Sequence, residues 1–241
     1  LSSSQAILID QQTGQVVAIA NTDANGAFSL TGIPIGNYGL TASTSKAWGG
    51  VNATDALVIA NHFAGNALLQ GLKLLAADVN FNQQINATDA LLVMRRFVGA
   101  DNSFTAGDWL FDSSQLVLSG GLQLMQDVNG LAYGDVNASY VPNGSRAASR
   151  LFVAQQGISY VGKQLNRIPV KLESSRELGA LSAVLLLPAG LEVQYVRPVQ
   201  LLGGQFDYRI ESNELRIGWF STSSVNLQAG DVLFELEMRA D

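Results

Sequence analysis

The sequence contains no cysteine and one histidine among its 241 residues, and only 14% of its residues are charged. Without cysteine, the chain has neither disulfides nor thiolate ligands for a metal. The hydrophobic fraction of 47% excludes a disordered chain, and no apolar run reaches the roughly 18 residues that a membrane-spanning helix needs. With 24 glycines and 8% aromatic residues, this profile is typical of a β-rich, turn-rich extracellular or surface protein.

Net acidic charge is confined to the first part of the chain. Residues 1–145 hold ten Asp, no Glu and four Lys or Arg, for a net charge of −6, whereas residues 146–241 hold ten acidic and ten basic residues. Asp is the carboxylate that turns and calcium loops favour. Because an acidic surface repels phosphate, we expect no nucleic-acid partner. The chain begins at Leu1 without a charged and apolar leader, and we expect any export signal to have been removed or to lie outside this sequence.

Residues 1–43 predict short strands separated by turns. Strands are expected at residues 6–9, 16–21, 27–30 and 38–41, with reversals at Gly14, Gly26 and Gly36. The motif Thr22-Asp-Ala-Asn-Gly-Ala-Phe resembles the hairpin of the carboxypeptidase-regulatory-like (transthyretin-like) β-sandwich. This resemblance implies a partial sandwich at residues 1–43 that acts as a scaffold.

Residues 51–65 are repeated at residues 85–99, a spacing of 34 positions, with 8 of 15 positions identical. Each copy places an Asp beside a Thr suited to capping a helix, continues with apolar residues at helical spacing, and ends at Gly. The repeat therefore predicts a loop, a helix and a stop, twice.

Residues 78–89 have the spacing of an EF-hand-type calcium loop. Oxygen-bearing side chains stand at loop positions 1, 3, 5, 9 and 12, and position 7 offers its backbone carbonyl. Since every candidate is an oxygen donor, calcium is favoured over zinc. Gln83 at position 6, where glycine is usual, needs a positive φ. The alternative is a polar turn that only caps the second helix. The candidate ligands are Asp78, Asn80, Asn82, Gln84 and Asp89.

The duplicated loop and helix resemble a dockerin, the calcium-dependent docking domain of secreted bacterial assemblies, over about residues 44–100. The resemblance implies docking to a protein partner through the faces of two short helices. At positions that dockerins commonly use for this contact, the sequence has Ala87, Thr88, Arg95 and Arg96.

The first repeat departs from the calcium pattern in the front half of its loop. Its positions 1, 3 and 5 are Thr44, Lys46 and Trp48, which do not suit calcium. Only its later positions, including Gly50 at position 7 and Asp55 at position 12, match the pattern. The first loop is therefore incomplete in its own stretch of sequence.

Residues 135–139 offer the missing front half, because their Asp-Val-Asn-Ala-Ser sequence repeats the Asp-Val-Asn-Phe-Asn of residues 78–82. We therefore expect a split calcium site, in which one segment supplies positions 1, 3 and 5 and the other supplies positions 7 and 12. The alternatives are that the Lys46 ammonium fills the site, that Asp135 makes an Asx turn, or that Asp127-Val-Asn129 is the front half. The expected ligands are Asp135, Asn137, Ser139, the Gly50 carbonyl and Asp55.

Residues 146–241 predict a β-sandwich, because apolar and polar residues alternate in several short runs between glycine turns. Residues 164–172, 178–193 and 229–237 resemble a cohesin, the jelly-roll sandwich that receives dockerins. The chain stops at Asp241, where a cohesin is expected to continue. We expect that this domain is truncated or that its last strand comes from another chain.

The sequence thus predicts a multidomain, mainly β protein with a small α module. The expected domains are the partial sandwich (1–43), a dockerin-like calcium-binding module with a strand-rich extension (44–145), and a cohesin-like sandwich (146–241) after a linker near residues 141–149. We expect a non-catalytic assembly or adhesion segment of a secreted or cell-surface bacterial protein, which binds one or two calcium ions and docks to proteins, including other copies of itself.

Two alternatives to this function remain. One is a carbohydrate-binding module of a secreted enzyme, with Trp48, Trp109 and Trp219 as the sugar platform. We expect these tryptophans to pack in cores or domain interfaces instead. The other alternative is a glycoside hydrolase fragment, since two carboxylates can meet from anywhere in a chain.

Overall fold

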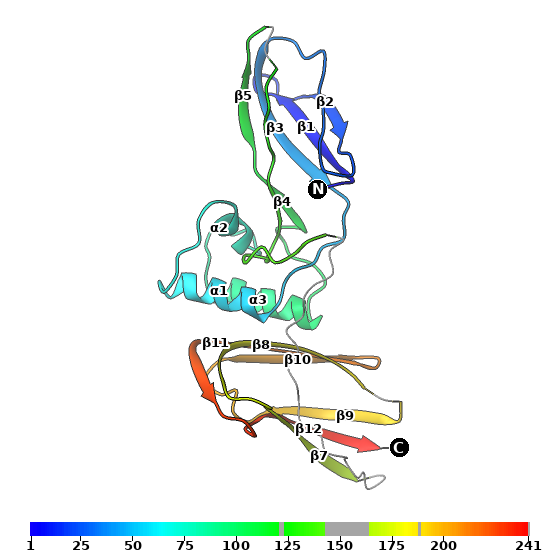
Figure 1. Cartoon of the computed structure of the whole chain (residues 1–241), viewed down its shortest axis with the longest axis vertical. Helices are drawn as coiled ribbons and strands as arrows, with labels where there is room; N and C mark the ends of the chain where they lie inside the picture. Colours follow the sequence, from blue (N-terminus) through cyan, green and yellow to red (C-terminus); the bar gives the residue numbers. More distant parts are fainter. Residues whose placement is uncertain (121–122, 143–163, 188, 241) are drawn as a thin grey trace.

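The computed structural model of the protein describes residues 1–120, 123–142, 164–187 and 189–240. Three layers follow one another along its long axis: an N-terminal sheet, a helical module and a C-terminal sandwich (Figure 1). The described residues form twelve strands and three helices, so the chain is mainly β with a small α module. Most of the expected linker and residues 146–163 of the expected third domain lie outside the described residues.

The N-terminal sheet is antiparallel and has the strand order β2-β1-β3-β5. Its strands are β1 (Ser4–Asp10), β2 (Val16–Asn21), β3 (Gly36–Thr44) and β5 (Ser114–Leu118). The chain therefore returns to this sheet after the helical module, and Leu118 pairs with Gly36. Residues 27–30 form no strand, contrary to the sequence prediction. Instead, Phe28 and Leu30 pack from a loop against the buried side chains of Leu8 and its neighbours.

The helical module contains α1 (Ala53–Phe63), α2 (Gly71–Ala77) and α3 (Ala87–Val98). The repeat predicted α1 and α3, but not the short α2. The caps are Asn52 and Asn86, one residue before each helix, rather than the expected threonines. Each Asn side chain accepts a hydrogen bond from the Thr backbone two residues on. No helix in the described ranges has the length and apolar character needed to cross a membrane.

Two short strands connect the sheet and the helical module. They are β4 (Trp109–Phe111) and β6 (Gly130–Ala132), which pair antiparallel with Trp109 opposite Ala132. This ribbon leads the chain from β6 into the loop of residues 133–140, beside the start of α1. The segment between β3 and α1 is thereby joined to the segment after α3.

The C-terminal sandwich consists of two three-stranded antiparallel sheets, β10-β11-β8 and β7-β12-β9. Their inner faces share one buried core that includes Ile217, Trp219, Phe234 and Leu236. The strands are β7 (Leu165–Lys171), β8 (Arg176–Leu186), β9 (Leu191–Pro198), β10 (Gln205–Glu211), β11 (Glu214–Leu227) and β12 (Val232–Ala240).

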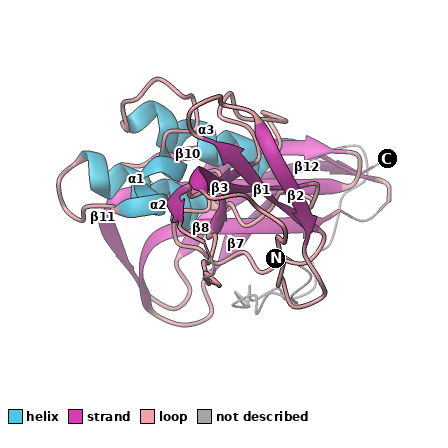
Figure 2. Cartoon of the chain, turned by 90° about the horizontal axis from the view of Figure 1, so that it is seen from above, coloured by secondary structure: helices cyan, strands magenta, loops and turns pink. Residues whose placement is uncertain are grey.

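Helices α1 and α3 lie on the outer face of the sheet β10-β11-β8 (Figures 1 and 2). The burial pattern of β11 records this cover. In residues 214–217, buried side chains alternate with more exposed ones, as in a strand with one face open to solvent. Residues 218–221 are all buried. Both faces of the middle strand are therefore covered where the helices lie.

Candidate functional site

The predicted calcium loop folds around two carboxylates. Asp78 Oδ1 accepts a hydrogen bond from the Asn82 backbone N–H (3.0 Å), and Oδ2 accepts one from the Gln83 N–H (2.7 Å). The Asn80 side-chain oxygen also accepts from the Asn82 N–H (3.1 Å). Asp89, in the first turn of α3, accepts from the Asn80 N–H through Oδ1 (3.4 Å) and closes the capping box through Oδ2. These bonds bring Asp78, Asn80 and Asp89 together.

The charges of this loop fit a cation. Asp89 is fully buried, and burial raises the pKa of its carboxyl above the ordinary value, as does the nearby charge of Asp78. Backbone hydrogen bonds from Asn86 and Asn80 act in the opposite direction on that pKa. The ion pairs found among the described residues involve neither carboxylate. A bound cation would therefore remove a repulsion that the protein itself leaves in place.

The loop also contains two residues in the left-handed region. Gln83 has a φ of 65°, as the missing glycine at position 6 requires, and Phe81 has a φ of 59°. Such a conformation costs a residue with a side chain roughly 1–2 kcal/mol. Such strain persists only where the surrounding structure enforces it, and loops that bind ligands are common examples.

The two predicted halves of the split site meet in the structure. Asp135 Oδ1 accepts from the Ser139 N–H (3.1 Å), and its Oδ2 accepts from the Tyr140 N–H (2.9 Å). The Asn137 side-chain oxygen accepts from the Ser139 N–H (2.8 Å). Asp55 Oδ1 accepts from the Asn137 N–H (3.1 Å), across a separation of 82 residues. Asp55 Oδ2 closes the capping box of α1.

Each of these contacts has a counterpart in the continuous loop. Asp135 takes the place of Asp78, Asn137 that of Asn80, and Asp55 that of Asp89, with the same carboxylate oxygens used. The left-handed residue at loop position 4 is also repeated, since Ala138 has a φ of 58° where Phe81 has 59°. The split loop is thus a second copy of the same geometry built from two segments.

Gly50 lies against the carboxylate of Asp135. It has a φ of 100°, and a Cβ atom there would stand 2.7 Å from Asp135 Cγ and 2.8 Å from Oδ2. Only glycine fits this approach. The Gly50 carbonyl accepts a hydrogen bond from the Asn52 side-chain amide (3.1 Å). All five residues expected in the split site are therefore neighbours.

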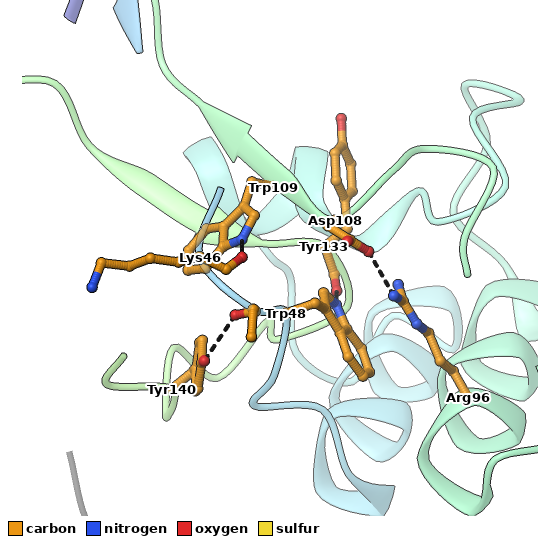
Figure 3. Close-up of polar contacts among 8 residues, drawn as sticks. Lys46, Trp48, Arg96, Asp108, Trp109, Tyr133 and Tyr140 are labelled. Atoms are coloured by element: carbon orange, nitrogen blue, oxygen red, sulfur yellow. Dashed lines mark hydrogen bonds and ion pairs between the residues drawn. The ribbon is translucent and has the colours of Figure 1, made fainter. Parts of the chain in front are cut away.

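Two of the three alternatives to the split site have little support in the structure, while the hydrogen bonds that Asp135 accepts are compatible with both a turn and a ligand loop. Asn129, from the rival front half, donates hydrogen bonds from its backbone and its side chain to Asp112. Lys46 takes part in none of the ion pairs found among the described residues, and its side chain points away from the other labelled residues (Figure 3). Nowhere in the described ranges do three His, Cys, Asp or Glu side chains gather. Amide, hydroxyl and carbonyl oxygens must complete either ligand shell.

Aromatic side chains hold the two segments of the split loop together (Figure 3). Trp48 donates its indole N–H to the Tyr133 carbonyl (3.1 Å), and Trp109 donates its indole N–H to the Lys46 carbonyl (2.9 Å). The Tyr140 hydroxyl donates to the Ala47 carbonyl (2.9 Å). Trp48, at position 5 of the first loop, thus binds the chain that leads into residues 135–139.

Arg96 is an internal residue, contrary to the expectation that it faces a partner. It is 7% exposed, and its guanidinium lies 3.6 Å from the ring centre of Trp48 and 4.3 Å from that of Phe104. It also forms an ion pair with Asp108 at 2.6 Å (Figure 3). These contacts between a cation and two rings stabilise the interior of the helical module.

The other three predicted docking residues lie on the side of the module that faces the sandwich. Ala87 and Thr88 line a cleft together with Gly204 of the sandwich. Arg95 pairs with Asp101 at 2.8 Å, which raises the pKa of its guanidinium, and the charge of Asp207 on β10 acts in the same direction. Ala87 and Thr88 remain exposed in this cleft, so the predicted docking residues lie beside the sandwich and are not covered by it.

Sandwich side chains bind the ends of both helices. Ser182 on β8 accepts a hydrogen bond from the Ala53 N–H (2.8 Å), at the start of α1. Arg216 on β11 donates to the Phe97 carbonyl (3.4 Å), and Arg209 on β10 donates to the Gly99 carbonyl, at the end of α3. Free N–H groups at a helix start and free carbonyls at a helix end need such partners, and cations are favoured at the end.

Two glycines of the sandwich allow the helices to approach. A Cβ atom on Gly218 would stand 2.9 Å from Met94 Cγ, and one on Gly179 would stand 2.9 Å from Leu57 Cδ2. The sequence patterns do not predict a role in this contact for these glycines, or for Ser182, Arg209 and Arg216. An isolated glycine inside a predicted strand is the one signal that could have shown a close approach.

The helical segment matches a known family. Residues 49–98 match the family model of the dockerin type I domain, which confirms the dockerin resemblance for this part of the chain. No curated protein sequence matches the chain. The likeness to the transthyretin-like sandwich stays a prediction.

One solved structure is similar to part of the chain. It is the non-cellulosomal cohesin from the hyperthermophilic archaeon Archaeoglobus fulgidus, at 25% sequence identity and a TM-score of 0.30. The likeness covers 33% of this chain and 56% of that chain, so this chain spans little more than half the length of that structure.

Proposed function

We propose that this chain is a non-catalytic protein-docking segment, in which the dockerin-like helical module docks on the sandwich of its own chain. The observation that carries this proposal is the buried contact between α1, α3 and the outer face of β10-β11-β8. Phe220 of β11 is 5% exposed and belongs to the same buried cluster as Ile59 and Met94 of the helices. A shared buried cluster of this kind holds the helices against the sheet.

Two calcium ions would stabilise this docked arrangement. One would bind at the continuous loop through Asp78, Asn80, Asn82, Gln84 and Asp89, and the other at the split loop. When bound, calcium supplies positive charge between paired carboxylates and fixes the loops that start α3 and α1. An ordered start of α1 favours docking, because it fixes the Ala53 N–H, which donates a hydrogen bond to Ser182 of the sandwich. Ala53 directly follows Asn52, the cap of α1.

The tryptophans support docking over carbohydrate binding. Trp219 is fully buried in the sandwich core, and Trp48 and Trp109 are half-buried and hold the split loop together. A sugar platform needs a row of exposed aromatic faces. The acidic, cysteine-free composition and the dockerin match favour a secreted or cell-surface bacterial protein as the setting of this segment.

Calorimetry and thermal melting of the whole chain test this function. We expect two calcium ions per chain, a lower melting temperature after chelation, and faster amide exchange of α1 and α3 without calcium. No calcium binding together with an unchanged melt would overturn the proposal. A glycan array with calcium serves as the second arm, and binding there that leaves α1 and α3 unaffected would favour the carbohydrate alternative.

A further inference from the structure

We propose that the open edge of β2 is a docking site for an extended basic segment of another protein, which pairs with β2 and lengthens the N-terminal sheet by one strand. This contact is separate from the docking of the helical module and does not depend on it. The edge combines free backbone groups, a run of uncharged side chains and one carboxylate at each end.

The outer side of β2 offers backbone groups that no described strand takes up. β2 is the first strand in the order β2-β1-β3-β5, and in the described part of the chain it pairs with β1 alone (Figure 1). The Thr22 N–H donates to the Ser4 carbonyl (2.8 Å), and the next pair in the register is Asn21 opposite Gln5. Hydrogen-bonded and non-hydrogen-bonded pairs alternate in an antiparallel ladder. Asn21 and Ile19 therefore direct their N–H and C=O groups to the open side.

β2 lacks the side chains that usually protect an edge strand. Its sequence, Val-Val-Ala-Ile-Ala-Asn, contains neither a charge nor a proline. Each edge strand of the sandwich, by contrast, carries at least two charged side chains, and these strands are β7, β8, β9 and β10. Charges on an edge discourage pairing with another chain. The bulge at Val17 twists one end of β2, but residues 18–21 keep a regular register with β1 and remain suited to pairing.

Side chains on both faces of β2 favour an added strand with β-branched residues at its centre. On the open face of the sheet, Ile19 is 54% exposed and lies opposite Ile7 of β1. On the other face, Ala18 packs against the buried cluster that contains Leu8. Ala18 and Ala20 are small and partly exposed, so they leave the margin of that cluster uncovered. Larger apolar side chains on a neighbouring strand would cover both margins.

A carboxylate at each end of the edge favours a basic segment. Asp10 and Asp23 are the only charged side chains in residues 1–45. The Asp10 N–H donates to the Gln15 carbonyl (2.9 Å), directly before β2, and Asp23 stands two residues after its end. Each carboxylate uses Oδ1 to accept backbone hydrogen bonds of its own turn. Neither takes part in the ion pairs found among the described residues. Two fixed negative charges therefore select lysine or arginine at both ends of the added segment.

A synthetic peptide tests the site on the whole chain in calcium. The peptide alternates threonine and valine, has a lysine at each end, and is long enough to span β2. We expect it to bind, as measured by fluorescence anisotropy, and to slow amide exchange at Ile19 and Asn21. The same peptide with glutamate at both ends should bind at least about tenfold more weakly, because attraction becomes repulsion. A fully N-methylated lysine peptide has no backbone donors and should not bind.

Two sets of variants separate backbone pairing from charge. Ile19→Pro removes an N–H that faces away from β1, a position where an edge strand tolerates proline, and should weaken binding by about tenfold. Ile19→Thr is the matched control, since it keeps the N–H and a β-branched side chain, and it should bind as the wild type does. Asp10→Asn combined with Asp23→Asn keeps Oδ1 as the acceptor in both turns. This pair should weaken binding by about fivefold and remove most of its salt dependence.

Each contrary outcome contradicts a stated part of the inference. No binding of the lysine peptide, or protection of β5 in place of β2, would overturn the site. Equal binding of the lysine and glutamate peptides would overturn the basic partner. Sedimentation that shows the wild-type chain associating with itself, and Ile19→Pro abolishing this, would replace that partner with a second copy. If Ile19→Pro fails to fold, the N-methylated peptide makes the same test on the unchanged protein.

Discussion

The continuous loop of residues 78–89 and the split loop of residues 50–55 and 135–139 reach one geometry by two routes. In both, a front Asp and a final Asp accept equivalent backbone hydrogen bonds, and position 4 is left-handed. The final Asp closes the capping box of the following helix in each case. The positions of the oxygens in space therefore define such a site, and the order of the segments along the chain does not.

The two loops differ in what holds them closed. The final contact of the continuous loop joins residues 9 positions apart, whereas that of the split loop joins residues 82 positions apart. Closing a longer loop costs more chain entropy, although the cost grows slowly with length. Trp48 and Tyr140 offset this cost, because their hydrogen bonds join the residues that flank the two segments, and Trp109 binds the first of these flanks from β4.

The largest effect is expected when the Asp at loop position 1 is removed from one site at a time. Asp135→Ala and Asp78→Ala should each reduce calcium stoichiometry from two to one, because a carboxylate ligand is lost. With calcium at 100 times its dissociation constant, loss of one ion should lower the free energy of unfolding by about 2.7 kcal/mol. Isothermal titration and chemical unfolding measure both quantities.

Asp127→Ala is the matched control, since this Asp begins the rival front half but lies next to Asn129, which binds Asp112. It should retain two ions. An Asp135→Ala chain that still binds two would show that Asp135 is not a ligand.

A substitution at Gly50 should damage the split site alone. Gly50→Ala adds a Cβ within 2.8 Å of the Asp135 carboxylate at a φ of 100°. The strain alone should cost at least about 1–2 kcal/mol, and the displaced carboxylate should weaken one calcium site. Titration of this variant should show one site changed and one at wild-type affinity. Equal weakening of both sites would mean that the two loops are coupled rather than separate.

Much of the site follows from local sequence, as these two loops show. The 34-residue repeat predicts both helices and both final Asp residues, and the repeated Asp-Val-Asn predicts which distant segment completes the first loop. These features are visible because each depends on a few neighbouring residues. The prediction of the caps is wrong by two positions in each repeat, because Thr and Asn can both cap a helix and the structure uses Asn52 and Asn86.

The docking contact could not be predicted in the same way. Arg209 and Arg216 alternate with apolar residues as on any solvent-facing strand, and nothing local shows that α3 ends beside them. Arg96 looks like a surface residue of an amphipathic helix, yet Trp48 and Phe104 enclose it from other segments. The return of β5 to the first sheet is likewise a long-range pairing.

The pH dependence of the continuous loop should change sign with calcium. Because the pKa of Asp89 is raised in the folded protein, the calcium-free fold binds a proton more tightly than the unfolded chain does. In chelator, this group should therefore make the fold more stable as pH falls toward its raised pKa. With calcium present, the proton competes with the ion, so affinity should fall over the same range. Titrations of Asp135→Ala isolate this loop, and a parallel loss of stability in both conditions would contradict the assignment of Asp89.

The smallest expected effect concerns the position at which the continuous loop departs from the calcium pattern. Gln83 has a φ of 65° and is exposed, so Gln83→Gly removes backbone strain without removing a buried contact. Its N–H still donates to Asp78. Glycine also gives the unfolded chain more freedom, which offsets part of the gain, and the net increase in stability should be below about 1 kcal/mol. Chemical unfolding in calcium measures it, and Gln84→Gly, next in the chain and without a positive φ, is the matched control that should be destabilising. A loss of stability in Gln83→Gly would show that side-chain contacts of Gln83 contribute more to stability than its backbone strain costs.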